Sequence, residues 1–166
     1  MFCIGDQVVH PMHGAGVIDD IVRERIGVES REYYVFRMPV GGLLLKIPTA
    51  NTAAVGLRAL LEPGAVEQVL EAIPSMDAEE TSNWNKRYRE NLSRLKSGDL
   101  YQVAQVIKIL MHRDARRGLS TGERKMLHSA KQILISEMVL TEHVEYAQAE
   151  ARLDSKMMQQ PQEKEG

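Results

Sequence analysis

The spacing of apolar residues changes from a strand pattern to a helix pattern near residue 50, and this change constrains the fold most strongly. Before it, short runs rich in β-branched and aromatic residues alternate with glycines and prolines; the runs are residues 8–9, 17–18, 33–36 and 43–47. Such runs are typical of short strands. After it, apolar residues recur every three or four positions, as on one face of a helix. We therefore predict an α+β protein in which a β module precedes a helical one.

Residues 1–50 are predicted to form a small barrel or curled sheet of the Tudor or SH3 kind, because several short strands follow one another closely. Residues 32–38 partly alternate between apolar and polar side chains, which suits a strand with one solvated face. Gly41-Gly42 lies between two strand-like runs and predicts a hairpin turn, since glycine reaches a positive φ without strain.

The remainder is predicted to be helical. We expect short helices and a linker over residues 51–82, a helical domain over 83–158 and a disordered polar tail over 159–166, with four to five helices in the bundle. Cap residues support these limits: Thr81, Ser82 or Asn83 can begin one helix, Asp99 can begin the next, and Ser120 with Glu123 forms a capping box. The expected helices cover residues 65–73, 83–96, 99–117, 121–140 and 143–158.

Charge is distributed unevenly along the chain. Residues 84–131 hold 12 Lys and Arg but only 4 Asp and Glu, whereas the whole chain has a formal net charge of −2. A basic region inside an acidic chain is the electrostatic pattern that nucleic-acid contact requires.

No pattern of an enzyme is found, and we expect no catalytic residues and no cofactor. A phosphate-binding glycine loop, a nucleophile elbow and paired catalytic carboxylates are all missing from the sequence. His10 and His13 are spaced like a metal-ligand pair, but three or four converging ligands are needed, so we expect no metal site. With neither a signal peptide nor a 20-residue apolar run in view, we expect a cytoplasmic protein without membrane contact. A monomer is the expected state, although no sequence feature determines it.

Trp84 is the only tryptophan, and it begins the predicted helix 83–96 with Lys86, Arg87 and Arg89 close behind it. An exposed indole at a helix end can wedge against a DNA base step while neighbouring cations pair with phosphates. The alternative is that the indole packs inside the bundle, as aromatic residues at helical spacing usually do. Trp84 stands one turn ahead of the residues expected in the core, which are Tyr88, Leu92 and Leu95.

A second group of cations flanks the predicted turn at Gly118-Leu119. These cations could share one corner of the bundle with the start of the Trp84 helix. The arginines that precede the turn could equally serve to complement the dipole of their own helix. The group consists of Arg113, Arg116, Arg117, Arg124 and Lys125.

The chain resembles the CarD-type RNA polymerase-binding transcription factors of bacteria. The resemblance covers about residues 2–142 and rests on four motifs: residues 2–14, Asn83-Trp84-Asn85-Lys86-Arg87-Tyr88-Arg89-Glu90-Asn91, residues 97–99 and residues 117–127. The N-terminal part alone is also similar to the polymerase-binding module of transcription-repair coupling factors.

The resemblance implies a Tudor-like module that binds the lobe of the RNA polymerase β subunit, and a helical domain that binds promoter DNA near the −10 element. A tryptophan at the position of Trp84 would wedge into the minor groove at the upstream edge of the bubble and stabilise the open complex. The implied DNA-contacting residues are Trp84, Lys86, Arg87, Arg89, Arg124 and Lys125.

On the polymerase side the implied residues are Arg23, Glu24, Arg25, Lys46 and Pro48. Two of them depart from the family pattern, which often has arginine where Glu24 and Lys46 stand. Lysine keeps the charge but loses the bidentate geometry of arginine. Glu24 reverses the charge, and Arg23 or Arg25 could compensate for it.

A different function remains open beside this one. The helical domain could bind another protein instead of DNA, with Trp84 as an interface anchor, because tryptophan is enriched at such anchors.

Overall fold

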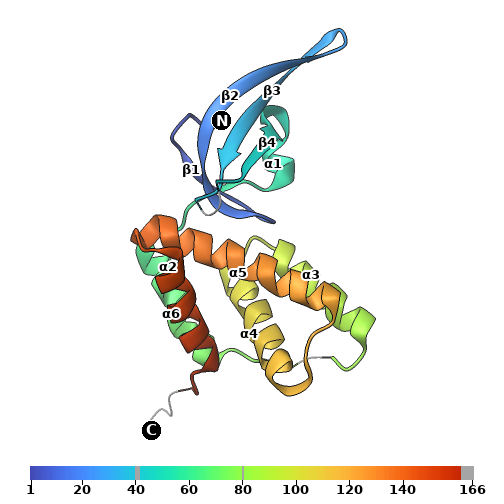
Figure 1. The fold of residues 1–166 in the computed structure, drawn as a ribbon, viewed down its shortest axis with the longest axis vertical. Coiled ribbons are helices and arrows are strands. Elements are labelled where there is room, and N and C mark those ends of the chain that lie inside the picture. Colours follow the sequence, from blue (N-terminus) through green and yellow to red (C-terminus); the bar gives the residue numbers. More distant parts are fainter. Residues whose placement is uncertain (40–41, 80, 162–166) are drawn as a thin grey trace.

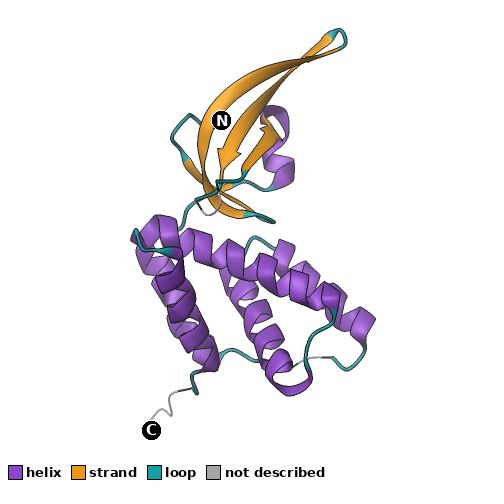
Figure 2. Ribbon diagram, in the orientation of Figure 1, coloured by secondary structure: helices purple, strands orange, loops and turns teal. Residues whose placement is uncertain are grey.

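The computed structural model describes residues 1–39, 42–79 and 81–161 and shows an antiparallel sheet beside a bundle of helices (Figures 1 and 2). The α+β class is as predicted. The five strands lie in the order β4-β3-β2-β1-β5. Their bounds are β1 Gln7–His10, β2 Gly14–Ile26, β3 Glu29–Arg37, β4 Leu44–Pro48 and β5 Arg58–Ala59.

β2 and β3 form a long hairpin that projects from the sheet, as Figure 1 shows. The register shifts between Ile18 and Asp20, and such an irregularity bends a strand and increases its twist. The half of the hairpin nearer the bundle contributes to the apolar core of the sheet, together with β1, β4 and the residue after β3. That core consists of Val8, Ile18, Tyr34, Phe36, Met38 and Ile47.

The turn predicted at Gly41-Gly42 is only partly within the described residues. Gly41 lies outside them, whereas Gly42 has a φ of +63°. The amide of Met38 donates to the carbonyl oxygen of Leu43 at 2.9 Å, so the chain does reverse between β3 and β4.

The helical part contains every helix that the sequence predicts, with bounds that differ by a few residues. A short 3-10 turn, Thr49–Asn51, leads into α1, Thr52–Val55, and a second 3-10 turn, Ile73–Ser75, follows α2. The five helices of the bundle are α2 Pro63–Ala72, α3 Trp84–Lys96, α4 Leu100–Arg117, α5 Thr121–Glu142 and α6 Tyr146–Met158.

The predicted helix caps are confirmed. The side chain of Asn83 accepts a hydrogen bond from the amide of Lys86, and Asp99 accepts one from the amide of Tyr101. Ser120 and Glu123 form the complete capping box at the start of α5. Each cap satisfies an amide that the first turn of a helix leaves unpaired, so these short local patterns determine where the helices begin.

The segment 51–82, predicted as short helices and a linker, is more closely integrated than that. β5 pairs with β1 through Val8↔Ala59 and Val9↔Arg58, so the sheet continues to residue 59. α2 places Val66, Val69 and Leu70 in the same core as α4, α5 and α6. A two-residue strand is too short to show an apolar repeat in the sequence. It forms only because the neighbouring strand β1 provides its hydrogen bonds.

The sheet is joined to the bundle mainly through α5, which passes close to β1 and β2 (Figure 1). Both guanidinium end nitrogens of Arg58 donate to the carboxylate of Glu137, at 2.9 and 2.7 Å. The amide of Leu61 also donates to Glu137, at 2.9 Å, and the side chain of Glu137 is fully buried. The amide of Ala15 donates to the hydroxyl of Ser136 at 2.7 Å. We call these contacts the seam; they hold the two modules in one orientation.

Gly14 lies in the seam where no side chain fits. Its φ is +94°, and a Cβ atom there would lie 2.3 Å from Ser136 Oγ and 3.0 Å from the Cα atom of Ile133. We expect Gly14→Ala to lower the free energy of unfolding by about 3 kcal/mol, because a strained φ and a steric clash act together. Urea denaturation measures the change.

Gly27 is the matched control for this prediction. It has a φ of +64° at the tip of the β2–β3 hairpin, but a Cβ atom added there would meet nothing within 4 Å. Gly27→Ala therefore carries the conformational cost without the clash, about 1 kcal/mol. Equal losses in the two variants would show that the seam tolerates a side chain at Gly14.

Candidate nucleic-acid interface

Trp84 is the first residue of α3, and its ring is neither buried nor free. It is 43% exposed. It stacks on Tyr88 with the ring centroids 5.1 Å apart and an interplanar angle of 16°. Its Nε1 donates to Ser120 Oγ at 3.3 Å. The indole is thus held in a defined orientation while a large part of it faces solvent, which resolves the alternative of a core tryptophan.

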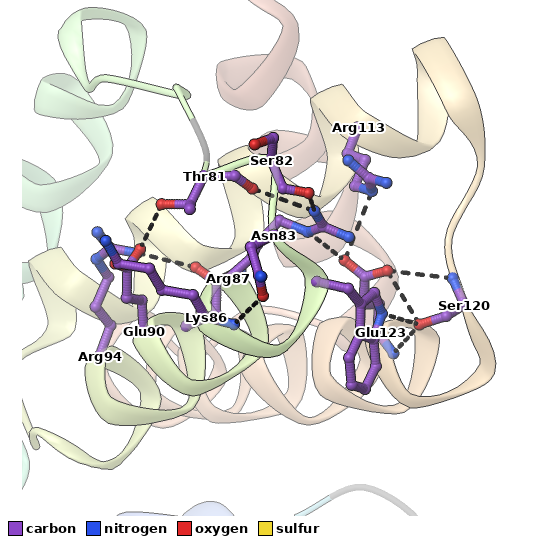
Figure 3. Close-up of polar contacts among 12 residues, drawn as sticks. Thr81, Ser82, Asn83, Lys86, Arg87, Glu90, Arg94, Arg113, Ser120 and Glu123 are labelled. Carbon is purple, nitrogen blue, oxygen red and sulfur yellow. Dashed lines mark hydrogen bonds and ion pairs between the residues drawn. The ribbon is translucent and has the colours of Figure 1, made fainter.

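Beneath this aromatic pair, a buried cluster ties the start of α3 to the start of α5. Glu123 is its centre (Figure 3). One carboxylate oxygen accepts from the Ser120 hydroxyl at 3.0 Å, and the other accepts from Arg87 Nε at 3.3 Å. Arg113 Nε lies 3.6 Å from the same oxygen as Arg87. Arg87 also donates to the backbone oxygens of Thr81 and Ser82, at 3.2 and 3.3 Å.

The pKa of Glu123 reflects these contacts. Burial by itself raises the pKa, but the hydrogen bonds from Ser120 and Arg87 and the charge of Arg87 outweigh burial, so the pKa lies below its ordinary value. Glu123 is therefore ionised at neutral pH and can hold both arginines.

Arg87 is a correction to the predicted DNA-binding set. It is 3% exposed and bound to Glu123, so it cannot reach a DNA backbone in this structure. Sequence spacing places Arg87 among cations, but only the position of α5 decides that this face of α3 is internal. Lys108 of the basic region is internal too, where it donates to the carbonyl oxygens of Ile73, Pro74 and Met76.

The other predicted DNA-binding residues are exposed. Lys86 and Arg89 lie on the same first two turns of α3 as Trp84, and Arg124 and Lys125 lie on the first turns of α5. The bond between Trp84 and Ser120 brings the two helix starts together. One end of the bundle therefore presents an exposed aromatic ring together with exposed cations from two helices, which is the composition expected of a surface that binds nucleic acid.

The predicted polymerase-binding residues lie on the sheet. Arg23, Glu24 and Arg25 are on β2, whereas Lys46 and Pro48 are on β4. Glu24 and Lys46 form an ion pair with each other, so these two departures from the family pattern partly neutralise one another. Side chains alternate along a strand, so Arg23 and Arg25 project from the opposite face, and any compensation for Glu24 acts from there.

β4 also forms one edge of the sheet, and within the described residues no strand pairs with its outer side. The exposed Leu44 lies on this strand, and the exposed Leu43 directly precedes it. An edge strand with unpaired backbone groups is able to accept a strand from another protein.

The two histidines near the start of the chain, His10 and His13, lie side by side. The rings of His10 and His13 are 4.6 Å apart, and His10 Nδ1 accepts from the amide of Met12. Burial, and then the charge of His13, lowers the pKa of His10 to about 4. Across residues 1–39, 42–79 and 81–161, no three His, Cys, Asp or Glu side chains gather in a way that could hold a metal ion. In the same part of the chain, no helix is long and apolar enough to cross a membrane.

Sequence reasoning missed the seam. Arg58 and Glu137 are 79 positions apart, so no local pattern links them. The one available signal was an acidic residue between Ser136 and Met138 in the most apolar part of α5. A carboxylate in such a place requires a buried partner.

Comparisons with known proteins agree with this architecture. Residues 2–60 match the model of the CarD-like/TRCF RID domain, and residues 68–154 match the model of the CarD C-terminal domain. The first match confirms the predicted Tudor-like module. The chain is also 33% identical over 138 residues to the protein YdeB of Bacillus subtilis (strain 168), a candidate transcription factor by its name. That alignment covers 83% of this chain and 90% of YdeB.

Proposed function

Because this chain belongs to the CarD family of transcription factors, we propose that it regulates transcription by binding two partners at once. The sheet binds the lobe of the RNA polymerase β subunit, and the helical bundle binds promoter DNA at the upstream edge of the bubble, near the −10 element. It acts without catalysis, as a monomer, in the cytoplasm where polymerase and the nucleoid are.

The observation that carries the proposal is the way Trp84 is presented. One part of its ring is supported by Tyr88 and Ser120, and the rest is exposed at the end of the bundle where α3 and α5 begin. Exposed cations lie on the first turns of both helices. A supported apolar ring can enter the minor groove and partly unstack a base step, while the cations pair with phosphates. Such a wedge opposes closure of the bubble.

The seam supports the two-partner arrangement. Bound polymerase places the sheet next to the promoter, and a rigid connection then places Trp84 at one position along the DNA. Holding one binding surface near its target converts the second contact into an intramolecular event, which raises its effective concentration. Weak DNA contacts suffice under this condition.

We expect Trp84→Ala to shorten the lifetime of the promoter open complex about tenfold, because a wedge contributes a few kcal/mol at most and about 1.4 kcal/mol is tenfold in a rate. The lifetime is measured with purified holoenzyme after a competitor is added. Affinity for polymerase without DNA should stay unchanged. Trp84→Phe keeps an apolar ring but loses the bond to Ser120, so its open-complex lifetime should lie between those of the wild type and Trp84→Ala.

An unchanged lifetime for Trp84→Ala would remove the wedge from the proposal. The exposed aromatic pair of Trp84 and Tyr88 would also suit an anchor for another protein, and salt separates the two functions. Binding through phosphates weakens steeply between about 50 and 200 mM salt, whereas an apolar protein interface responds much less.

A further inference from the structure

A basic cleft lies near Trp84, between the segment that precedes α3 and the last turns of α4. Its volume is about 350 Å³, and it is lined by Glu79, Ser82, Arg113, Arg116 and Arg117. Ser82 is only two residues before Trp84. The cleft and the indole are therefore two neighbouring features of one end of the bundle.

The three arginines are positioned by the helix that carries them. Positions 113, 116 and 117 are three and four residues apart, which places their side chains on one face of α4. Arg113 is held by Glu123, and the same carboxylate is linked through Ser120 to Trp84. The cleft is thus connected to the wedge by a short series of direct contacts.

The charges of Arg116 and Arg117 are available to a ligand. Both are exposed, and neither forms an ion pair with any acid in the described part of the chain. Arg116 Nε makes only a 3.4 Å bond to the carbonyl oxygen of His112, which leaves its two end nitrogens for a ligand. Among the described residues that line the cleft, Glu79 is the one acid, set against three arginines.

The helix dipole alone accounts for only part of this arrangement. Cations in the last turn of a helix offset the partial negative charge there, and this explains why Arg116 and Arg117 are favourable on α4. It does not explain why they line a cleft together with Ser82, which directly precedes the cap of the helix that carries Trp84.

We propose that this cleft binds a phosphate group, with Arg116 and Arg117 as the charged ligands and the Ser82 hydroxyl as a further donor. Arginine presents several N–H donors in a planar arrangement that matches phosphate oxygens. The nearest source is a backbone phosphate of the strand whose base step Trp84 opens, so this inference rests on the proposed function. A free diphosphate would offer the same chemistry.

The test uses the full-length chain, polymerase holoenzyme and a fork-junction promoter DNA. We expect Arg116→Gln and Arg117→Gln each to weaken DNA binding, and the Arg116→Gln/Arg117→Gln double variant to lower the slope of log affinity against log salt by about 1, as loss of one phosphate contact does. The matched control is Lys96→Gln, which removes one charge from the exposed far end of α3. It should leave the slope unchanged.

A second measurement identifies the source of the phosphate. Pyrophosphate is titrated into the chain alone and followed by NMR at the amides of residues 82 and 113–117. If pyrophosphate shifts these signals in the wild type but not in the Arg116→Gln/Arg117→Gln double variant, and DNA affinity is unaffected, the cleft takes a free diphosphate. If both DNA affinity and pyrophosphate binding fall, it takes a DNA phosphate.

Two outcomes overturn the inference. One is an unchanged salt slope together with no pyrophosphate response. The other is an equal loss in Lys96→Gln, which would indicate only the overall charge of the bundle. In both cases Trp84→Ala is measured in parallel. If Trp84→Ala still shortens the open-complex lifetime, the phosphate-binding role of the cleft is wrong while the proposed function stands.

Discussion

Arg58→Met is expected to lower the free energy of unfolding by about 3 kcal/mol, since removing one partner of a buried ion pair leaves the other charge without compensation. Glu137 is fully buried, and Arg58 supplies two of its hydrogen bonds. After the substitution, only the amide of Leu61 remains of the three seam donors to this carboxylate. Urea denaturation of the purified chain gives the change directly.

The double variant Arg58→Met/Glu137→Met is the decisive control. Replacing both members of a buried pair with apolar residues of similar size is often close to neutral, so the double variant should recover most of the lost stability. Its free energy of unfolding should then exceed that of Arg58→Met. A double variant as unstable as the sum of the two single variants would show that Arg58 and Glu137 act independently, and the seam would need a different explanation.

The seam variants also separate stability from positioning. In Arg58→Met/Glu137→Met the exposed side chains of Trp84, Lys86 and Arg89 are untouched, because they lie at the other end of the bundle from Glu137. If the seam sets the position of Trp84 relative to bound polymerase, this folded double variant should bind polymerase normally and yet shorten the open-complex lifetime.

Glu123→Gln is expected to have the second large effect, with a loss of about 3 kcal/mol in the free energy of unfolding. Arg87 is buried, and its charge is compensated by the carboxylate of Glu123. Glutamine keeps the shape and can still accept a hydrogen bond, but it removes the carboxylate charge that Arg87 and Arg113 share, and weakening a buried ion-pair cluster in this way is costly. Since Ser120 contacts both Glu123 and Trp84, the variant should also shorten the open-complex lifetime.

The pH dependence of stability provides an independent check on Glu123. Its pKa is lowered in the folded state, so the stabilisation is fully present above the ordinary pKa near 4.5 and is lost as the pH falls through the lower folded value. The difference in free energy of unfolding between wild type and Glu123→Gln should therefore shrink as the pH is lowered from about 6 towards about 3. A difference that stays constant over that range would mean that the charge of Glu123 contributes nothing.

Local signals explain why so much of the fold was predictable. The β module, the five helices of the bundle and the caps at Asn83, Asp99 and Ser120 all follow from residues within a few positions of one another. Apolar periodicity and cap chemistry act over one or two turns. For Trp84 the spacing left two positions open, the edge of the bundle and its core; the resemblance to the CarD-type family favoured the edge, and the structure places the residue there with 43% exposure.

Contacts between distant segments could not be predicted in this way. β5 exists because β1 offers it hydrogen bonds, and α2 joins a core built mostly by helices far from it in the sequence. Arg58 and Glu137 meet only after the sheet has been placed on α5. No periodicity encodes such pairings, since each depends on where complete elements pack.

The sequence by itself therefore determined the class of the fold, the limits of its helices and the basic region led by Trp84. Tertiary structure decided which of those cations are accessible to a partner: α5 buries Arg87 against Glu123, while Lys86, Arg89, Arg124 and Lys125 remain exposed. The physical reason is that spacing tells which residues share a face of a helix, whereas the packing of a second helix decides whether that face meets solvent or a buried carboxylate.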